Sequence, residues 1–198
     1  MKTFLHVGCG HNSKSMTTRG FNTDAWTEIR LDINPKVKPD IVGTMTDMSK
    51  VPDASVDAIF SSHNIEHLYP HEVPMALEEF VRVLRPGGFA VITCPDLQSV
   101  CKLISEDQLT EPAYQSDAGP IAPIDIIYGH RAAMAAGNLF MAHRSGFTKK
   151  VLLATLMEAG FKNAGGRQRS DYFDLWAIAS KADMGEDMVR NLVVEHFP

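Results

Sequence analysis

The chain has 198 residues, of which 44% are hydrophobic and 22% charged, with a formal net charge of −5. This composition is typical of a soluble globular domain and excludes a disordered or collagen-like chain. No apolar run approaches the roughly 18 residues that cross a bilayer, and residues 1–6 show no signal-peptide pattern. Three cysteines without metal-ligand spacing fit a reducing compartment. We therefore expect a cytoplasmic protein.

Short apolar runs alternate with helical patterns along the chain. Strands are predicted at Thr3–Val7, Glu28–Ile33, Asp40–Gly43, Val56–Phe60 and Gly88–Cys94. Before the last of these, apolar residues at helical spacing, Leu77, Phe80, Val81 and Leu84, predict a helix that Pro86-Gly87-Gly88 stops. A second helix begins after the N-cap Thr148 and ends at Gly160. Strands at Phe161–Arg167 and Tyr172–Ser180 and a terminal helix at Met184–Phe197 follow.

This alternation predicts an α/β fold, a doubly wound, Rossmann-like and mostly parallel sheet of about seven strands with helices on both faces. We expect a single domain over residues 1–198. Residues 97–147 are too long for a simple loop, so we expect an insertion after the fifth strand that forms a lid with short helices. In such a fold the ligand binds at the carboxyl ends of the strands.

A glycine loop and an acidic residue lie where a nucleotide-like ligand would bind. Gly8-Cys9-Gly10 follows the first strand and presents backbone without bulky side chains. Asp32 ends the second strand and can accept hydrogen bonds from two ribose hydroxyls. Together these residues indicate an adenosine-containing cofactor.

The residues after the loop discriminate between adenosine cofactors. Residues 11–20 have no amphipathic helical face, whereas a dinucleotide needs a helix amino terminus for its pyrophosphate. S-adenosylmethionine carries no phosphate and tolerates a missing first helix. Asp47 and Met48, after the third strand, are predicted to contact its adenine, the first by accepting a hydrogen bond and the second by packing. A nicotinamide-dependent dehydrogenase remains an alternative.

Five segments in order resemble the class I S-adenosylmethionine-dependent methyltransferases, and more narrowly the type 11 group of bacterial enzymes. These segments are Leu5–Gly10, Leu31–Ile33, Val56–Leu68, Phe80–Gly88 and Ala159–Phe161. The resemblance implies S-adenosylmethionine as cofactor and S-adenosylhomocysteine as product. It implies cofactor contacts by residues of the glycine loop, of the second and fourth strand ends and of the segment after the third strand: His6, Gly8, Cys9, Gly10, Asp32, Ile33, Asp47, Met48 and Ser62.

Two positions depart from the family pattern. His6 stands where the family usually has an acid, and Asn12 stands near a usual glycine. These departures keep an alternative open, a noncatalytic module that binds S-adenosylmethionine or S-adenosylhomocysteine and works through a partner.

Histidines provide the candidate catalytic groups. Methyl transfer is an in-line displacement in which positioning supplies most of the acceleration, and an oxygen or nitrogen acceptor can also need a base. His63, after the fourth strand, and His143, before Phe147, are the predicted bases, and Arg144 is a candidate for binding an anionic acceptor. His63 to His67 also reads as H-x-x-E-H, a zinc pattern on a long helix, but Pro70 and Pro74 limit any helix there. We therefore predict no metal.

The acceptor is predicted to be a small molecule or saccharide-like compound. Cys94-Pro95 has the reverse order of the cytosine-methylating pattern, and Ser61–Asn64 lacks the pattern of adenine-methylating enzymes, so nucleic acid is not expected. The prediction of a saccharide-like acceptor is based on a resemblance. The missing first helix and the insertion resemble those of methyltransferases of surface-glycan synthesis. A membrane span is not expected, and a homodimer stays open.

Overall fold

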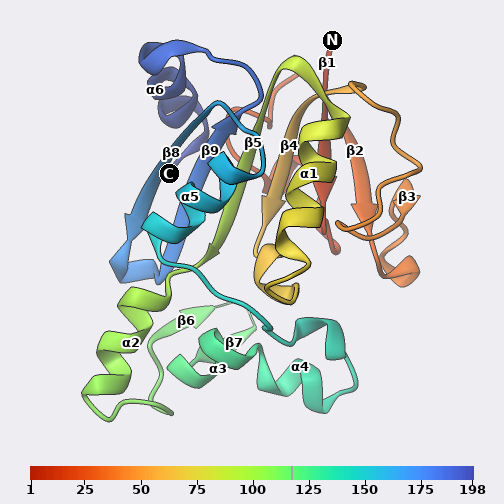
Figure 1. The fold of residues 1–198 in the computed structure, drawn as a ribbon. Coiled ribbons are helices and arrows are strands. Elements are labelled where there is room, and N and C mark those ends of the chain that lie inside the picture. The colour runs from red at the N-terminus through yellow and green to blue at the C-terminus, as the bar shows by residue number, and fades with distance from the viewer. Residues whose placement is uncertain (117) are drawn as a thin grey trace.

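A computed structural model describes residues 1–116 and 118–198 and confirms the predicted α/β architecture (Figure 1). Seven strands form one sheet in the order β3-β2-β1-β4-β5-β9-β8. Their bounds are β1 Lys2–Val7, β2 Trp26–Asp32, β3 Ile41–Val42, β4 Val56–Ser62, β5 Leu84–Pro95, β8 Asn163–Arg169 and β9 Asp174–Ser180. Strands β1 to β5 pair in parallel, and β9 runs antiparallel to both β5 and β8.

Both faces of the sheet are covered, because side chains of successive strand residues point to opposite sides. On one face lie α1 (Val73–Val83) and α5 (Lys149–Glu158), whose Leu77 and Leu156 pack into the larger core cluster (Figure 1). Thr148 caps α5 as predicted, because its side chain accepts from the backbone N–H of Val151. The terminal helix α6 (Gly185–His196) covers the opposite face.

A first crossover helix is absent, as the loop sequence predicted. Between β1 and β2 there is only a single 3₁₀ turn at Lys14–Met16. The face that this helix would cover is filled by aromatic rings instead: Phe21 stacks on Phe4 with ring centroids 4.5 Å apart and also packs against His196 of α6. The carboxyl-terminal helix thus helps to bury the face that the short connection leaves open.

The Pro86-Gly87-Gly88 segment differs from the prediction. The preceding helix ends at Val83, and the three residues lie within β5 rather than in a turn that separates helix from strand. The pairing of β4 with β5 shifts register here, between the pairs made by Val56 and Ala58. The segment therefore acts as an irregularity inside the strand, where extra residues can be accommodated without ending the ladder.

Residues 97–147 lie below the carboxyl ends of the parallel strands (Figure 1). They contain α2 (Leu97–Ser105), a small hairpin of β6 (Tyr114–Ser116) and β7 (Gly119–Ile121), α3 (Pro123–Tyr128) and α4 (Arg131–Ala135). Val100, Ile121 and Ile126 form a separate small core. Throughout the part of the chain that the structure describes, no helix is long and apolar enough to cross a membrane.

Candidate cofactor and acceptor site

The turn after β1 is built around Gly8, which has a φ of +65°. A Cβ at this position would lie 1.9 Å from Oδ1 of Asn64, so only glycine fits. The Asn64 amide fills the space because its Nδ2 donates to the carbonyls of Val7 and Ser62, at 3.1 and 2.8 Å. The ends of β1 and β4 are thereby held together at the edge of the sheet where the ligand is expected.

Asp32 closes the other side of this turn. One carboxylate oxygen accepts from the backbone N–H of Gly10 at 2.7 Å, and the other accepts from that of Asn34 at 2.8 Å. Each oxygen keeps a further lone pair. The two remaining acceptor positions suit the vicinal hydroxyls of a ribose.

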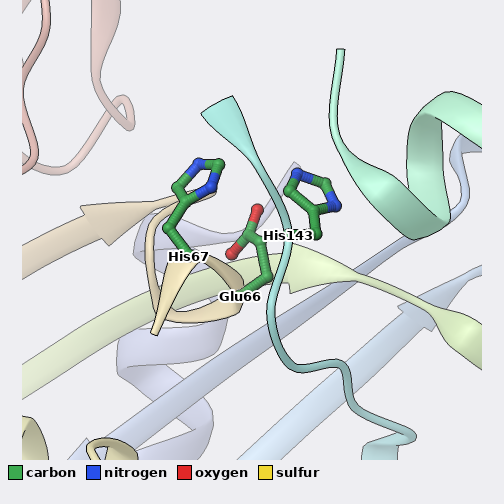
Figure 2. A group of neighbouring side chains, drawn as sticks. All are labelled: Glu66, His67 and His143. Atoms are coloured by element: carbon green, nitrogen blue, oxygen red, sulfur yellow. The ribbon is translucent and has the colours of Figure 1, made fainter. Parts of the chain in front are cut away.

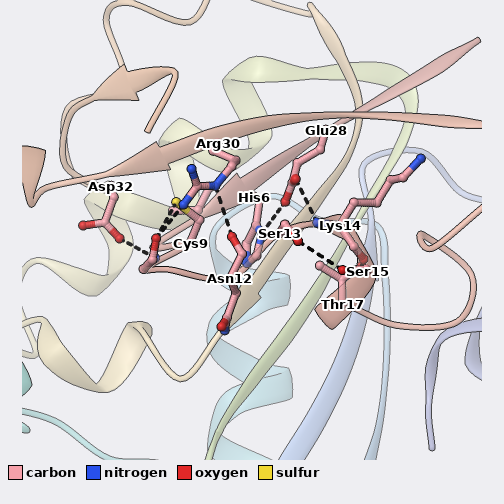
Figure 3. Close-up of polar contacts among 12 residues, drawn as sticks. His6, Cys9, Asn12, Ser13, Lys14, Ser15, Thr17, Glu28, Arg30 and Asp32 are labelled. Atoms are coloured by element: carbon pink, nitrogen blue, oxygen red, sulfur yellow. Dashed lines mark hydrogen bonds and ion pairs between the residues drawn. The ribbon is translucent and has the colours of Figure 1, made fainter. Parts of the chain in front are cut away.

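Two further side chains of β2 hold the loop that replaces the missing helix (Figure 3). The Arg30 guanidinium donates to the backbone carbonyls of Gly10, Asn12 and Lys38. Glu28 accepts from the backbone N–H of Lys14 at 2.8 Å. Sequence reasoning missed both residues, although alternation along a strand places Glu28, Arg30 and Asp32 on one face.

His6 pairs with Glu28 rather than facing the ligand (Figure 3). Its Nδ1 lies 2.7 Å from Oε1 of Glu28, and its ring is buried beside Phe60. Burial lowers the pKa of His6, although Glu28 opposes this effect. His6 therefore supports the loop through Glu28 and supplies no side-chain contact to the cavity described next.

A cavity of about 390 Å³ lies at the carboxyl ends of β1, β2 and β4. Five predicted cofactor residues and one predicted base line it: Gly8, Gly10, Asp32, Ile33, Ser62 and His63. Thr44, Met45 and the supporting Asn64 join them. From the insertion come Asn138, Phe140, Met141 and Arg144, so cofactor-type residues and the insertion enclose one volume.

Four predicted cofactor residues do not line this cavity. His6 is buried as described, and Cys9 is buried with a pKa that burial raises to about 11. Met48 is buried, and its backbone N–H donates to Glu79. Asp47 borders a smaller neighbouring hollow, so Thr44 and Met45 occupy the side of the main cavity expected for Asp47 and Met48.

His63 and Glu66 lie just beyond β4. His63 has a φ of +54°, its side chain is half exposed, and its Nδ1 lies 3.4 Å from Oε1 of Glu66. Desolvation disfavours the charged form of His63, yet the neighbouring Glu66 carboxylate outweighs it and raises the pKa. Burial likewise opposes ionisation of Glu66, but the surrounding imidazoles outweigh it and lower its pKa. The contact between His63 and Glu66 therefore favours the ionised form of the Glu66 carboxyl group.

His143, the second predicted base, is not part of the cavity lining, whereas His67 is. The two imidazoles have ring centroids 5.0 Å apart, and the Glu66 carboxylate lies between them (Figure 2). Burial lowers the pKa of His143. Of the two predicted bases, only His63 faces the volume in which an acceptor would bind.

The segment 143–147 fastens the end of the insertion to the site. The backbone N–H groups of Arg144 and Ser145 both donate to the Glu66 carbonyl, at 2.8 and 3.1 Å. The Arg144 guanidinium donates to the carbonyl of His67 and lies over the ring of Tyr69. The insertion thus ends directly against the turn that follows β4.

Comparison with known proteins gives a family and a fold. Residues 5–92 match the family model of the type 11 group, described as a methyltransferase domain. Among curated protein sequences no significant match was found. Structural similarity is broad at low identity, so it shows the fold alone.

Three solved structures illustrate that similarity. A protein of Thermotoga maritima, described as an S-adenosylmethionine-dependent methyltransferase and possible histamine N-methyltransferase, has a TM-score of 0.57 at 13% identity, over 91% of this chain and 82% of its own. The 1,6-didemethyltoxoflavin N1-methyltransferase of Burkholderia thailandensis, solved with S-adenosylhomocysteine, has a TM-score of 0.56 at 16% identity. The match covers 92% of this chain and 72% of that protein. A methyltransferase of Aquifex aeolicus has a TM-score of 0.54 at 16% identity, and the match covers 90% of this chain and 81% of that protein.

The family match covers the glycine loop, Asp32 and the turn after β4, which are the parts that shape the cavity. It ends at residue 92, so it spans less than half of the chain. The chain is accordingly similar to the type 11 methyltransferases over residues 5–92, and its seven-stranded sheet has the fold of solved S-adenosylmethionine-dependent methyltransferases.

Proposed function

We propose that the chain is an S-adenosylmethionine-dependent methyltransferase that acts on a small-molecule or saccharide-like acceptor carrying a hydroxyl or amine. The observation that supports it best is the single cavity bounded on one side by Gly8, Gly10 and Asp32 and on the other by the insertion. Its volume of about 390 Å³ is within the range of about 300–1,000 Å³ for small-ligand sites. The structurally similar Burkholderia thailandensis enzyme was solved with bound 1,6-didemethyltoxoflavin and S-adenosylhomocysteine.

The residues present fit S-adenosylmethionine. Gly8 and Gly10 both have positive φ, so the chain can pass close to a ligand, and Asp32 keeps acceptor positions for two hydroxyls. In this proposal Thr44 and Met45 contact the adenine of the cofactor, and Ser62 lies near its reacting methyl group. When bound, the cofactor would supply a sulfonium methyl group to the nucleophilic atom of the acceptor, with S-adenosylhomocysteine as the leaving group.

The chain's own contribution to that displacement is positioning and proton acceptance. Residues 138–144 cover the cavity and orient the acceptor, with the Arg144 guanidinium available for an anionic group. His63 accepts the acceptor's proton, since it is the predicted base that faces the cavity. Three unpaired cysteines are consistent with the proposed cytoplasmic location.

The cofactor assignment is tested with Asp32→Ala. We expect the wild-type protein to bind S-adenosylmethionine and S-adenosylhomocysteine but not NAD in calorimetric titrations. Two charge-assisted hydrogen bonds contribute roughly 1.5–3 kcal/mol each, so the variant should bind at least about 100-fold more weakly. Asp24→Ala, which removes an exposed carboxylate far from the cavity, should bind like wild type.

Turnover with a panel of small hydroxyl and amine acceptors, including saccharides, then tests the reaction through formation of S-adenosylhomocysteine. Turnover in proportion to enzyme supports the proposal. Tight binding with no turnover on any acceptor would contradict the acceptor class and favour a binding module.

His63→Asn tests the proton acceptor, and asparagine tolerates the positive φ at this position. Loss of a general base typically costs about 10²–10⁴ in rate, so we expect kcat to fall about 100-fold or more. KM and cofactor affinity should change only a few-fold, because the cavity keeps its other contacts. A variant with unchanged kcat would show that positioning alone drives the reaction.

A further inference from the structure

Glu66 is a buried carboxylate without a hydrogen-bond partner in the described part of the chain, and its nearest ion-pair partner there is the half-exposed His63. Its side chain is 1% exposed, and neither carboxylate oxygen has a hydrogen-bond partner among residues 1–116 and 118–198. A buried carboxylate without partners is costly, so such groups usually pair with a cation or bind a metal. Its backbone carbonyl, by contrast, accepts hydrogen bonds from the N–H groups of Arg144 and Ser145.

Two imidazoles beside this carboxylate are held in the form that binds metals. Nδ1 of His67 lies 3.1 Å from the carbonyl of Ala142, and Nδ1 of His143 lies 2.8 Å from that of Ile126. A carbonyl only accepts, so each Nδ1 carries a proton, and in the neutral ring each Nε2 then keeps a lone pair for a metal. A histidine that donates one ring N–H to a backbone carbonyl is the usual arrangement in metal sites.

The three side chains converge. One ligand atom of Glu66, one of His67 and one of His143 all lie within 4.8 Å of one another (Figure 2). Zinc bonds of about 2.0–2.1 Å require these atoms to draw together by roughly 1 Å, which side-chain rotation can supply. His63 is a weaker partner for Glu66, because its ring is half exposed and its nitrogen stays 3.4 Å away.

We propose that Glu66, His67 and His143 bind one divalent transition-metal ion, with Zn²⁺ as the best match. Two imidazoles and a carboxylate suit zinc and its neighbours, whereas Mg²⁺ and Ca²⁺ prefer oxygen ligands alone. Three protein ligands leave a coordination position open. Since His67 lines the cavity, that position is within reach of an acceptor oxygen, a consequence that rests on the proposed function.

The sequence argument against a metal rested on helix geometry. A long helix is indeed absent, because Ile65–His67 forms only a 3₁₀ turn. The third ligand comes instead from His143, which the insertion brings back beside this turn. The ligand set proposed here therefore differs from the His63 and His67 pair that the sequence pattern suggests.

The test uses the full chain, stripped of metal with a chelator and without S-adenosylmethionine, so that it is independent of methyl transfer. Zn²⁺ is titrated in competition with a chromophoric chelator. We expect one ion per chain with micromolar or tighter affinity, and no measurable Mg²⁺ binding under the same conditions. Co²⁺ should give the visible absorption of a low-coordinate site.

Variants separate this site from adventitious binding. Glu66→Gln with His143→Gln should weaken Zn²⁺ binding at least about 100-fold, since loss of outer hydrogen bonds alone costs about 10–100-fold. His71→Gln, an exposed histidine four residues from His67, is the matched control and should bind like wild type. Zinc binding that is equal in all three proteins, or absent from wild type, would overturn the proposal.

Thermal unfolding supplies a second readout for Glu66→Gln alone. Without metal, removal of a buried unpaired charge should leave the midpoint unchanged or raise it, whereas Zn²⁺ should stabilise only wild type. If Glu66 instead serves a protonated histidine, the variant is less stable with and without Zn²⁺, which contradicts a metal site. Failure of cofactor binding or turnover would leave these results unaffected.

Discussion

Substitution of Gly8 by alanine is expected to abolish measurable S-adenosylmethionine binding and to lower the free energy of unfolding by about 3 kcal/mol or more. A left-handed backbone costs a residue with a Cβ about 1–2 kcal/mol. In addition, the new Cβ would displace the Asn64 amide and break its two hydrogen bonds to the ends of β1 and β4, worth about 1 kcal/mol each. Denaturant unfolding and calorimetric titration measure the two effects.

Gly10→Ala is the matched control for backbone strain. Gly10 also has a positive φ, but a Cβ there meets no atom within 4 Å, so only the cost of about 1–2 kcal/mol remains. Asn64→Ala in the Gly8→Ala background should recover part of the lost stability, because the clash disappears. Equal losses in the two glycine variants would show that Asn64 does not enforce glycine at position 8.

Acid is expected to destabilise the protein through His196. Its side chain is fully buried, its Nδ1 is 2.7 Å from the Thr18 hydroxyl, and its Nε2 has no hydrogen-bond partner among the described residues, with the Glu195 carboxylate 3.9 Å away. Burial lowers the pKa of His196 to about 4, against about 6.5 in the unfolded chain. The unfolded state therefore binds more protons between these values, and stability falls as the pH drops from about 6.5 towards 4.

The size of this effect follows from the difference in pKa. The pKa of His196 differs by about 2.5 between the folded and unfolded states, and each pKa unit corresponds to about 1.4 kcal/mol. The free energy of unfolding should therefore fall by roughly 3 kcal/mol, which lowers the unfolding midpoint by about 10 °C for a chain of this size. His196→Gln should be less stable at pH 8 yet lose less stability on acidification. The other histidines are present in both proteins, so their contribution to the pH dependence of stability cancels in the comparison. Parallel stability curves for the two proteins between pH 7 and 4.5 would contradict the assignment.

Sequence reasoning succeeded where one residue determines the local structure. Gly8 and Asp32 both lie in the turn after β1, which they help to shape, and both line the cavity, whereas the ribose contact of Asp32 stays a prediction. The missing first helix was predicted because residues 11–20 have no apolar face. The helix and strand types were right for the same reason, since their apolar periodicity is strong.

It failed where distant segments meet. Asp47 follows β3 in the chain, but the loop folds so that Thr44 and Met45 reach the cavity instead. The contact between Glu66 and His143 depends on the path of the insertion, which no local pattern specifies. Glu28 and Arg30 were the exception, because the alternation of charges along β2 could have indicated a polar face against the loop.

The attachment of segment 143–147 limits where the chain can change length. Besides the two bonds to Glu66, its backbone is tied to Tyr128 by the N–H of His143 and to Leu97 by the carbonyl of Phe147. A residue added or removed within it would shift every one of these pairs and misplace His143 against Glu66. By contrast, a Cβ added at Gly137, in the connection after α4, would meet no atom within 4 Å. Length variation in that connection would change which acceptors fit, while the turn after β4 and the cofactor loop stay in register.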